Sequence, residues 1–247
     1  MPVAQPLQPG RGPRLLALDS ATETLSVAVV DGARQWVADE AGGALASQRM
    51  LPLAFALLER AGLDLRDLDA IAFGRGPGAF TGLRTACSVA QGLAFGAGLP
   101  VLALDSLVVV AEDAHAQQGA HEIWVAMDAR MNEIYAAAYR RDGQGWQALQ
   151  APALWSPQAL VEAWRDAAPQ LVAGSALEAF GAQLATGAAV RITTLKDRAA
   201  ALARVARLAW QAEGAADAAS ALPLYLRDKV AHTTAERAAL AAAKLVA

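Results

Sequence analysis

One pattern occurs twice along this 247-residue chain. A short apolar run ends in an acidic residue, Asp19 or Asp128, and a polar turn and further apolar runs follow. In both halves the predicted order is strand, strand, strand, helix, strand, helix, strand. A repeat of about domain length indicates two similar lobes.

The composition favours a packed globular protein. Hydrophobic residues make up 55% of the chain and charged residues 18%, which is too apolar for a disordered chain. With a net charge of -3, the chain has no overall positive field that would attract nucleic acid without sequence preference. Tight RNA contact would therefore need a local basic patch or a partner protein.

Cysteine and histidine usage points away from disulfides and metals. The single cysteine, Cys87, excludes an intramolecular disulfide, which fits a reducing cytoplasmic compartment. The three histidines have no spacing typical of zinc ligands, so no metal site is predicted. The first 13 residues lack the apolar core of a signal peptide. The longest apolar stretch is shorter than the roughly 20 residues that a membrane span needs, so we expect a cytoplasmic protein without a membrane segment.

The pattern of apolar residues locates the elements and the lobes. Strands are predicted at 15–19, 25–30, 35–39, 69–73, 101–104, 123–128, 133–139, 147–149, 171–173 and 190–193. Helices are predicted at 47–60, 81–95, 107–117, 157–166 and near 177–184. We expect a loose tail at 1–14, an N-terminal lobe at 15–105, a C-terminal lobe at 106–230 and a tail at 231–247.

A glycine-rich loop at 74–84 joins a predicted strand to a predicted helix, a place where backbone N–H groups favour an anion. It does not match a P-loop, because no Gly-Lys-Ser/Thr follows. Gly74-x-Gly76-x-x-Ala79 matches part of a dinucleotide fingerprint, but Pro77 crowds the phosphate approach and the motif does not open its domain. A tight turn that binds no ligand is the alternative.

The turns after Asp19 and Asp128 are candidates for nucleotide binding. Matching hairpins that carry acids and hydroxyls and face a cleft can hold metal-bound phosphates. An ordinary role as turn formers is equally open from the residues alone. Nucleophilic catalysis has little support, since Cys87 and Ser88 lie in a helix of small residues without a base at a suitable spacing.

The helix at 47–60 has an apolar face about 200° wide, which one sheet cannot cover. Its apolar side chains fill two arcs, Met50, Leu53, Ala54 and Leu57 in one and Leu51, Phe55 and Leu58 in the next. The helix at 81–95 carries small residues that allow close approach of another helix. Exposed, these two helices would form a surface for a protein partner, unless other parts of the chain bury them.

Four segments of the chain resemble the bacterial TsaB (YeaZ) family. They are residues 16–23 (LALDSATE), 76–84 (GPGAFTGLR), 128–130 (DAR) and 223–227 (PLYLR). The similarity runs from about residue 15 to residue 230, in the same order as in the family. It implies an α/β, duplicated actin/Hsp70/sugar-kinase-like fold with two lobes, each a mixed sheet flanked by helices. It also implies a role in making N6-threonylcarbamoyladenosine at position 37 of tRNAs.

The resemblance further implies partners. In the family, this kind of subunit pairs with the catalytic subunit TsaD, and the ATPase TsaE joins them. TsaD carries a His-x-x-x-His metal pair, whereas Ser106 and Val110 stand at the matching positions here, and an aliphatic side chain cannot bind a metal. The expectation is a subunit that is not an enzyme on its own. It supports TsaD in transferring threonylcarbamoyl from threonylcarbamoyl-AMP, forms a homodimer when TsaD is absent, and reaches tRNA only through the complex.

The same resemblance suggests which residues matter. Asp19, Ser20, Thr22 and Asp128 would form the remnant of a nucleotide cleft, with residual ATP or ADP binding and no required cofactor or metal. The expected partner interface consists of Met50, Leu53, Leu57, Leu58, Phe80, Thr81 and Arg84. Which arc of the 47–60 helix faces outward stays open.

Two alternatives belong to other classes of protein. An ATP-dependent sugar-kinase-like phosphotransferase would bind ATP and magnesium by itself. A peptidase would need a nucleophile and a base that the sequence does not show.

Overall fold

The repeated sequence pattern forms two five-stranded sheets in the computed structural model, which describes residues 11–212 and 215–227. The strands of the first sheet are β1 (Arg14–Asp19), β2 (Thr24–Asp31), β3 (Arg34–Ala41), β4 (Ala70–Gly76) and β5 (Val101–Asp105). Those of the second are β6 (Glu122–Asp128), β7 (Ile134–Arg141), β8 (Trp146–Trp155), β9 (Leu171–Ala173) and β10 (Val190–Ile192). The spatial orders, β3-β2-β1-β4-β5 and β8-β7-β6-β9-β10, are the same. The duplicated architecture is confirmed.

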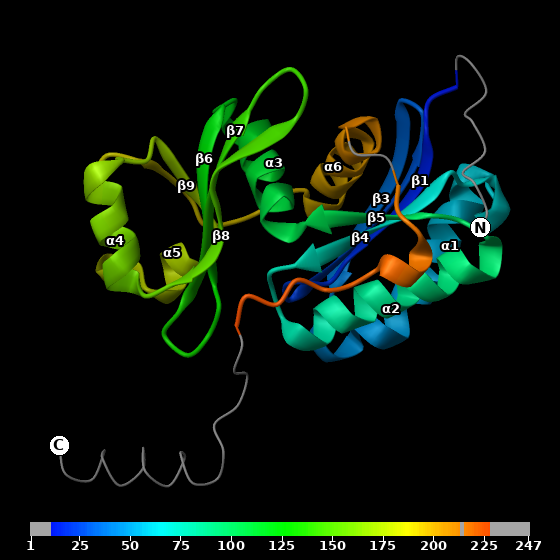
Figure 1. Ribbon diagram of the computed structural model, residues 1–247, viewed down its shortest axis with the longest axis horizontal. Helices are drawn as coiled ribbons and strands as arrows, with labels where there is room; N and C mark the ends of the chain where they lie inside the picture. Colours follow the sequence, from blue (N-terminus) through cyan, green and yellow to red (C-terminus); the bar gives the residue numbers. More distant parts are fainter. Residues whose placement is uncertain (1–10, 213–214, 228–247) are drawn as a thin grey trace, which may run out of the picture.

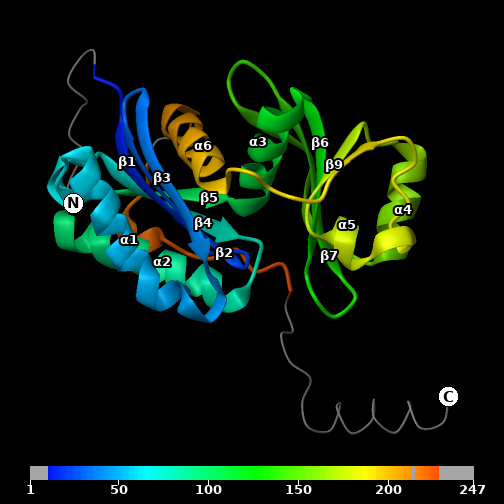
Figure 2. The ribbon, with the colours of Figure 1, turned by 180° about the vertical axis from the view of Figure 1, so that it is seen from behind.

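Helices cover both faces of each sheet, as Figures 1 and 2 show. They are α1 (Ala46–Ala61), α2 (Phe80–Ala97), α3 (Ser106–Gln118), α4 (Pro157–Asp166), α5 (Ala176–Ala179) and α6 (Arg198–Ala212). Helices α1 and α2 pack on one face of the first sheet and α6 on the other. Helix α3 lies between the two sheets, and α4 and α5 cover the outer face of the second.

The central strand β1 explains why its sequence is continuously apolar. Leu16 and Leu18 face the core under α1 and α2, whereas Leu15 and Ala17 face the core under α6. A strand buried on both faces has no polar side to alternate with. The strand pairs with β2 in antiparallel and with β4 in parallel orientation, so the sheet is mixed.

Two predictions of helices need correction. The segment predicted as a helix near 177–184 is the short α5 followed by a 3-10 turn at Gly181–Gln183. Helix α6 was not predicted at all. Its buried face consists mainly of alanines and includes Arg198, so it lacks the row of large apolar residues that marks an amphipathic helix.

The chain returns to the first lobe near its end. Helix α6, which the expected division places in the C-terminal lobe, packs on strands of the first sheet. The backbone of Ala216 pairs with that of Val101 at the edge of β5. The division after residue 105 therefore separates the two sheets but not the helices. The predicted tail at 231–247 and most of the tail at 1–14 lie outside the described residues.

The wide apolar face of α1 has a buried and an exposed part. Met50, Leu57 and Leu58 are buried in the core of the first lobe. Their assignment to a partner interface is therefore wrong for this chain, because the sheet and α2 already cover them. Leu53, also assigned to that interface, is half-buried against the same core.

The exposed apolar side chains of α1 are Leu51, with 38% of its surface accessible, and Phe55, with 49%. Both belong to the arc of Leu51, Phe55 and Leu58. This arc therefore faces outward, except for Leu58, which is buried. Within the described ranges, no helix has the length and apolar character needed to cross a bilayer.

The two parts of α1 should respond differently to a charge. Leu58→Glu would place an unpaired carboxylate in the core and should cost about 4 kcal/mol or more of unfolding free energy. Phe55→Glu should leave the melting temperature nearly unchanged, since the side chain is half exposed. Thermal melting followed by circular dichroism compares them. Equal melting temperatures for the two variants would contradict this division of the helix.

Candidate functional site

A cleft of about 1000 Å³ lies between the lobes. Its walls come from the turn after β1, the start of α2, the first turns of α3, the turn after β6, and the segment at 224–227. Thr22 and Asp128, predicted from the repeated pattern, both line it. The two equivalent hairpins therefore face each other across one cleft.

Asp19 lies beneath the cleft and not on its surface. The residue is fully buried. Its Oδ1 accepts hydrogen bonds from the backbone N–H of Ala21 at 2.9 Å and from Nη2 of Arg198 at 2.8 Å. Its Oδ2 accepts from the hydroxyl of Ser106 at 2.8 Å. Ser106 and Arg198 line the cleft and lie between it and this buried carboxylate.

Two glycines of the glycine-rich loop make this arrangement sterically possible. A Cβ atom on Gly74 would lie 1.8 Å from Oδ2 of Asp19, and one on Gly82 would lie 1.8 Å from the carbonyl oxygen of Ser20. Ser20 is itself buried and donates to the Gly82 carbonyl at 2.9 Å. These two positions need glycine because the loop packs closely against the β1 hairpin. The prediction that Asp19 and Ser20 are ligands in the cleft is wrong, because both residues are buried.

Arg198 is the residue that sequence reasoning missed. It opens α6, is 97% buried, since only 3% of its side chain is accessible, and forms an ion pair with Asp19. A cation at a helix N-terminus opposes the helix dipole, so Arg198 at the start of α6 is a sequence signal that an acid lies nearby. The buried carboxylate of Asp19 thus has its cationic partner within the same chain.

The turn after β6 holds Asp128. Its Oδ1 accepts from the backbone N–H of Arg130 at 2.8 Å. Residues 130–132 have φ angles of 62, 55 and 60°, a left-handed conformation that costs non-glycine residues about 1 kcal/mol each. Arg227 stabilises this turn by donating to the carbonyls of Ala129 at 3.1 Å and Arg130 at 3.3 Å. Contacts within the chain therefore fix the shape of the second hairpin.

Ser106 and Val110, at the positions that the resemblance matches to metal-binding histidines, are both buried. Ser106 holds Asp19 and accepts from the backbone N–H of Gly76 at 3.2 Å. In the part of the chain that the structure describes, no three His, Cys, Asp or Glu side chains gather where they could hold a metal ion.

The other expected interface residues lie at the start of α2. Thr81 and Arg84 are exposed and Phe80 is half-buried. The Arg84 guanidinium lies 3.8 Å from the centre of the Phe80 ring, and its Nε donates to the Tyr225 hydroxyl at 3.0 Å. The structure thus brings two of the motifs noted in the sequence, 76–84 and 223–227, together on the surface beside the cleft.

The buried ion pair should be measurable through stability. Arg198→Met would leave the Asp19 carboxylate buried without its cation, a change that costs about 3–5 kcal/mol in comparable sites. The double variant Asp19→Asn with Arg198→Met should recover part of this loss, because no buried charge remains. Urea unfolding of the wild type, both single variants and the double variant gives the coupling energy. A double variant no more stable than Arg198→Met would contradict the pairing.

The chain is similar to known proteins over most of its length. The family model "TsaD: tRNA N6-adenosine threonylcarbamoyltransferase" matches residues 43–244. A solved structure from Pseudomonas aeruginosa, described as similar to peptidase YeaZ, is 38% identical with a TM-score of 0.80. The match covers 87% of this chain and 100% of that one. A second structure, named YeaZ from the same organism, is 37% identical with a TM-score of 0.77 and the same coverage.

Curated relatives match a shorter part. The tRNA threonylcarbamoyladenosine biosynthesis protein TsaB of Escherichia coli K12 is 40% identical over 150 residues, which is 60% of this chain and 65% of that protein. The protein of the same name from Haemophilus influenzae is 43% identical over 128 residues, 52% of this chain and 54% of that one. The chain thus spans less than two thirds of the length of these curated relatives. Taken with the family model and the two structures, the matches show that the chain belongs to the TsaB (YeaZ) family.

Proposed function

We propose that this chain is a non-catalytic subunit required for N6-threonylcarbamoylation of adenosine 37 in tRNA. It pairs with the catalytic subunit TsaD in the cytoplasm and supports TsaD in transferring threonylcarbamoyl from threonylcarbamoyl-AMP, and the ATPase TsaE joins the complex. The names of the E. coli and H. influenzae relatives and the match to the TsaD model support the pathway. The net charge of -3 supports contact with tRNA through the complex and not through this chain alone.

The observation that carries the non-catalytic role is the ion pair between Asp19 and Arg198. Phosphoryl transfer needs carboxylates that hold a metal bound to the nucleotide. Here the carboxylate of the first hairpin is buried and already neutralised, which argues against the sugar-kinase-like alternative and against a required nucleotide. Among the described residues that line the cleft there is no histidine or cysteine, which argues against a peptidase.

The exposed faces of α1 and α2 support a protein partner. Leu51, Phe55 and Phe95, the last with 59% of its surface accessible, are large apolar side chains on these two adjacent helices. Gly92 and Gly96 lie one turn apart on α2, and a Cβ atom on either would meet nothing within 4 Å. A surface with large apolar residues around an open glycine row allows another helix to approach the α2 backbone closely.

This surface fits one occupant at a time. Because TsaD matches the same family model and thus shares the fold, its own helix pair can take the place of a second copy of this chain. We therefore propose one surface for both pairings, TsaD when it is present and a homodimer when it is not. Thr81 and Arg84, exposed at the start of α2, lie at the rim of this surface.

The substitution Gly92→Leu should impair pairing with TsaD or with a second copy while leaving folding intact. Leucine favours a helix over glycine by close to 1 kcal/mol and its Cβ meets nothing in this chain, so the melting temperature should hold or rise. The added side chain should nevertheless block close helix approach and reduce TsaD binding at least about tenfold. Size-exclusion chromatography and titration with purified TsaD measure both pairings. Gln158→Leu, at an exposed position of α4 in the other lobe, is the matched control.

Reconstitution tests the function itself. The chain alone, supplied with threonylcarbamoyl-AMP and tRNA, should form no modified adenosine, and addition of the chain to TsaD and TsaE should start its formation. Mass spectrometry of nucleosides from digested tRNA gives the readout. Modified tRNA made by this chain alone, or by TsaD and TsaE equally well without it, would refute the proposal.

A further inference from the structure

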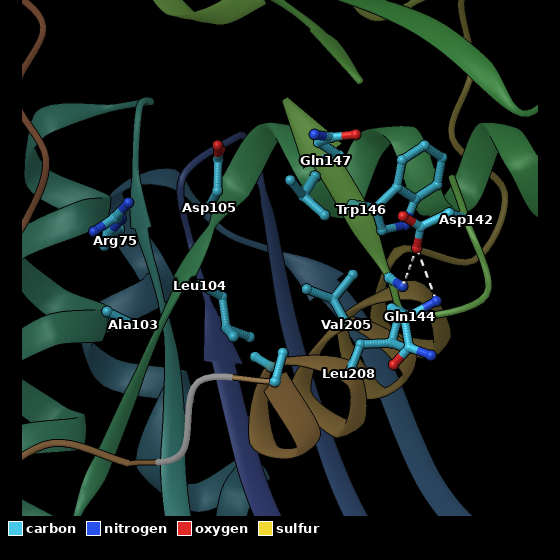
Figure 3. A pocket seen from close by; sticks show the side chains of 14 residues that line it. Arg75, Ala103, Leu104, Asp105, Asp142, Gln144, Trp146, Gln147, Val205 and Leu208 are labelled. Carbon is cyan, nitrogen blue, oxygen red and sulfur yellow. Dashed lines mark hydrogen bonds between the residues drawn. The ribbon is translucent and has the colours of Figure 1, made fainter. Parts of the chain in front are cut away.

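A second cavity, of about 410 Å³, lies between β5, α3, α6 and the hairpin that joins β7 to β8 (Figure 3). It shares no lining residue with the cleft between the two Asp hairpins. Both lobes contribute to it, since β5 belongs to the first sheet and β8 to the second. Neither the proposed function nor the partner surface uses it.

The cavity combines an apolar floor with polar groups at its ends. Leu104, Val108, Val205 and Leu208 provide the apolar part. The side chains of Gln144 and Gln147 belong to the wall formed by the β7–β8 hairpin and β8, as Figure 3 shows. Sites for small organic molecules share this composition, a mostly apolar lining with a few placed polar groups.

Asp105 supplies a carboxylate to the cavity. Its Oδ1 accepts from the backbone N–H of Leu107 at 2.9 Å, and its Oδ2 accepts from the hydroxyl of Tyr139 at 2.6 Å. The backbone N–H of Val108 also interacts with this carboxylate, and since a carboxylate offers about four acceptor positions, about one remains. Burial raises the pKa of this carboxyl above its usual value. No Lys, Arg or His nitrogen of the described residues lies within 4.0 Å of it, which leaves its charge without a direct partner.

Arg75 supplies the opposite charge to the same cavity. Its side chain is exposed at the end of β4, next to the strand that carries Asp105. It forms no ion pair with an acid of the described residues. The guanidinium is near enough to lower the pKa of Asp105, although burial has the larger effect. One cavity therefore holds a cation and a buried carboxylate that form no ion pair, together with an apolar surface; a second carboxylate, Asp142, belongs to the hairpin wall and accepts from the backbone N–H groups of Gln144 and Gly145.

We propose that this cavity binds a small zwitterion with an apolar side chain, of the branched-chain α-amino acid class. The ammonium group would contact Asp105, the carboxylate would contact Arg75, and the side chain would lie on Val108 and Leu208. An amine alone would leave Arg75 without a partner. A carboxylate alone would leave Asp105 without one. Because the walls come from both lobes, the bound molecule would also hold the lobes together.

Three small molecules of the same carbon skeleton test the charge requirement. L-leucine carries both charges, 3-methylbutylamine only the positive one, and 4-methylpentanoate only the negative one. Isothermal titration or ligand-observed NMR with the whole chain should show saturable leucine binding, with each analogue at least about tenfold weaker, as expected for loss of one charged contact. Absence of saturable leucine binding at millimolar concentrations would overturn the proposal.

Variants then locate the site. Arg75→Gln changes an exposed side chain and should fold normally, weaken leucine about tenfold and leave 3-methylbutylamine unchanged. Arg60→Gln, an exposed arginine on α1, is the control and should bind leucine like the wild type. Leu208→Trp fills the cavity without touching either charge and should abolish binding. Leucine binding that is the same in all three variants would place the ligand elsewhere and refute the assignment.

Discussion

The ion pair between Asp19 and Arg198 is the contact on which the arrangement of the cleft depends. It joins the end of β1, at the centre of the first sheet, to the start of α6, which follows the last strand of the second sheet. Two charges removed from water lose several kcal/mol of hydration each, and only close pairing with further hydrogen bonds offsets this loss. Ser106 and the Ala21 backbone provide those further bonds to Asp19. As a result, the carboxylate of Asp19 is buried beneath the cleft and is not exposed on its surface.

The ion pair also illustrates which elements of the fold could be predicted from the sequence. The strands were, because β1 and its neighbours are apolar runs bounded by turns, and the repeat of the order identified the two lobes. Helix α6 was not, because its buried face consists mainly of alanines and includes an arginine, with Leu202 and Val205 as its only large apolar side chains. Burial of Arg198 depends on an acid 179 residues earlier in the chain, and no local pattern reports a contact of that length.

The candidate sites divide in the same way. The sequence pointed to the turns of Asp19 and Asp128 as one cleft, and Thr22 and Asp128 do line it. It did not show that Asp19 and Ser20 are buried, because the close approach of Gly74 and Gly82 is a matter of tertiary packing. On α1 the helical wheel showed that the apolar face is too wide for one sheet. The packing of α1 on the first sheet and on α2 decides that Leu58 is core while Leu51 and Phe55 are exposed.

We propose that the ion pair with Arg198 leaves Asp19 unable to hold a metal-bound nucleotide in the cleft. Calorimetric titration of the purified chain with ATP in the presence of magnesium tests it most directly. We expect no saturable binding of ATP at micromolar concentrations, either to the wild type or to Asp128→Asn. Stoichiometric micromolar binding of magnesium and ATP that is lost in Asp128→Asn would contradict it.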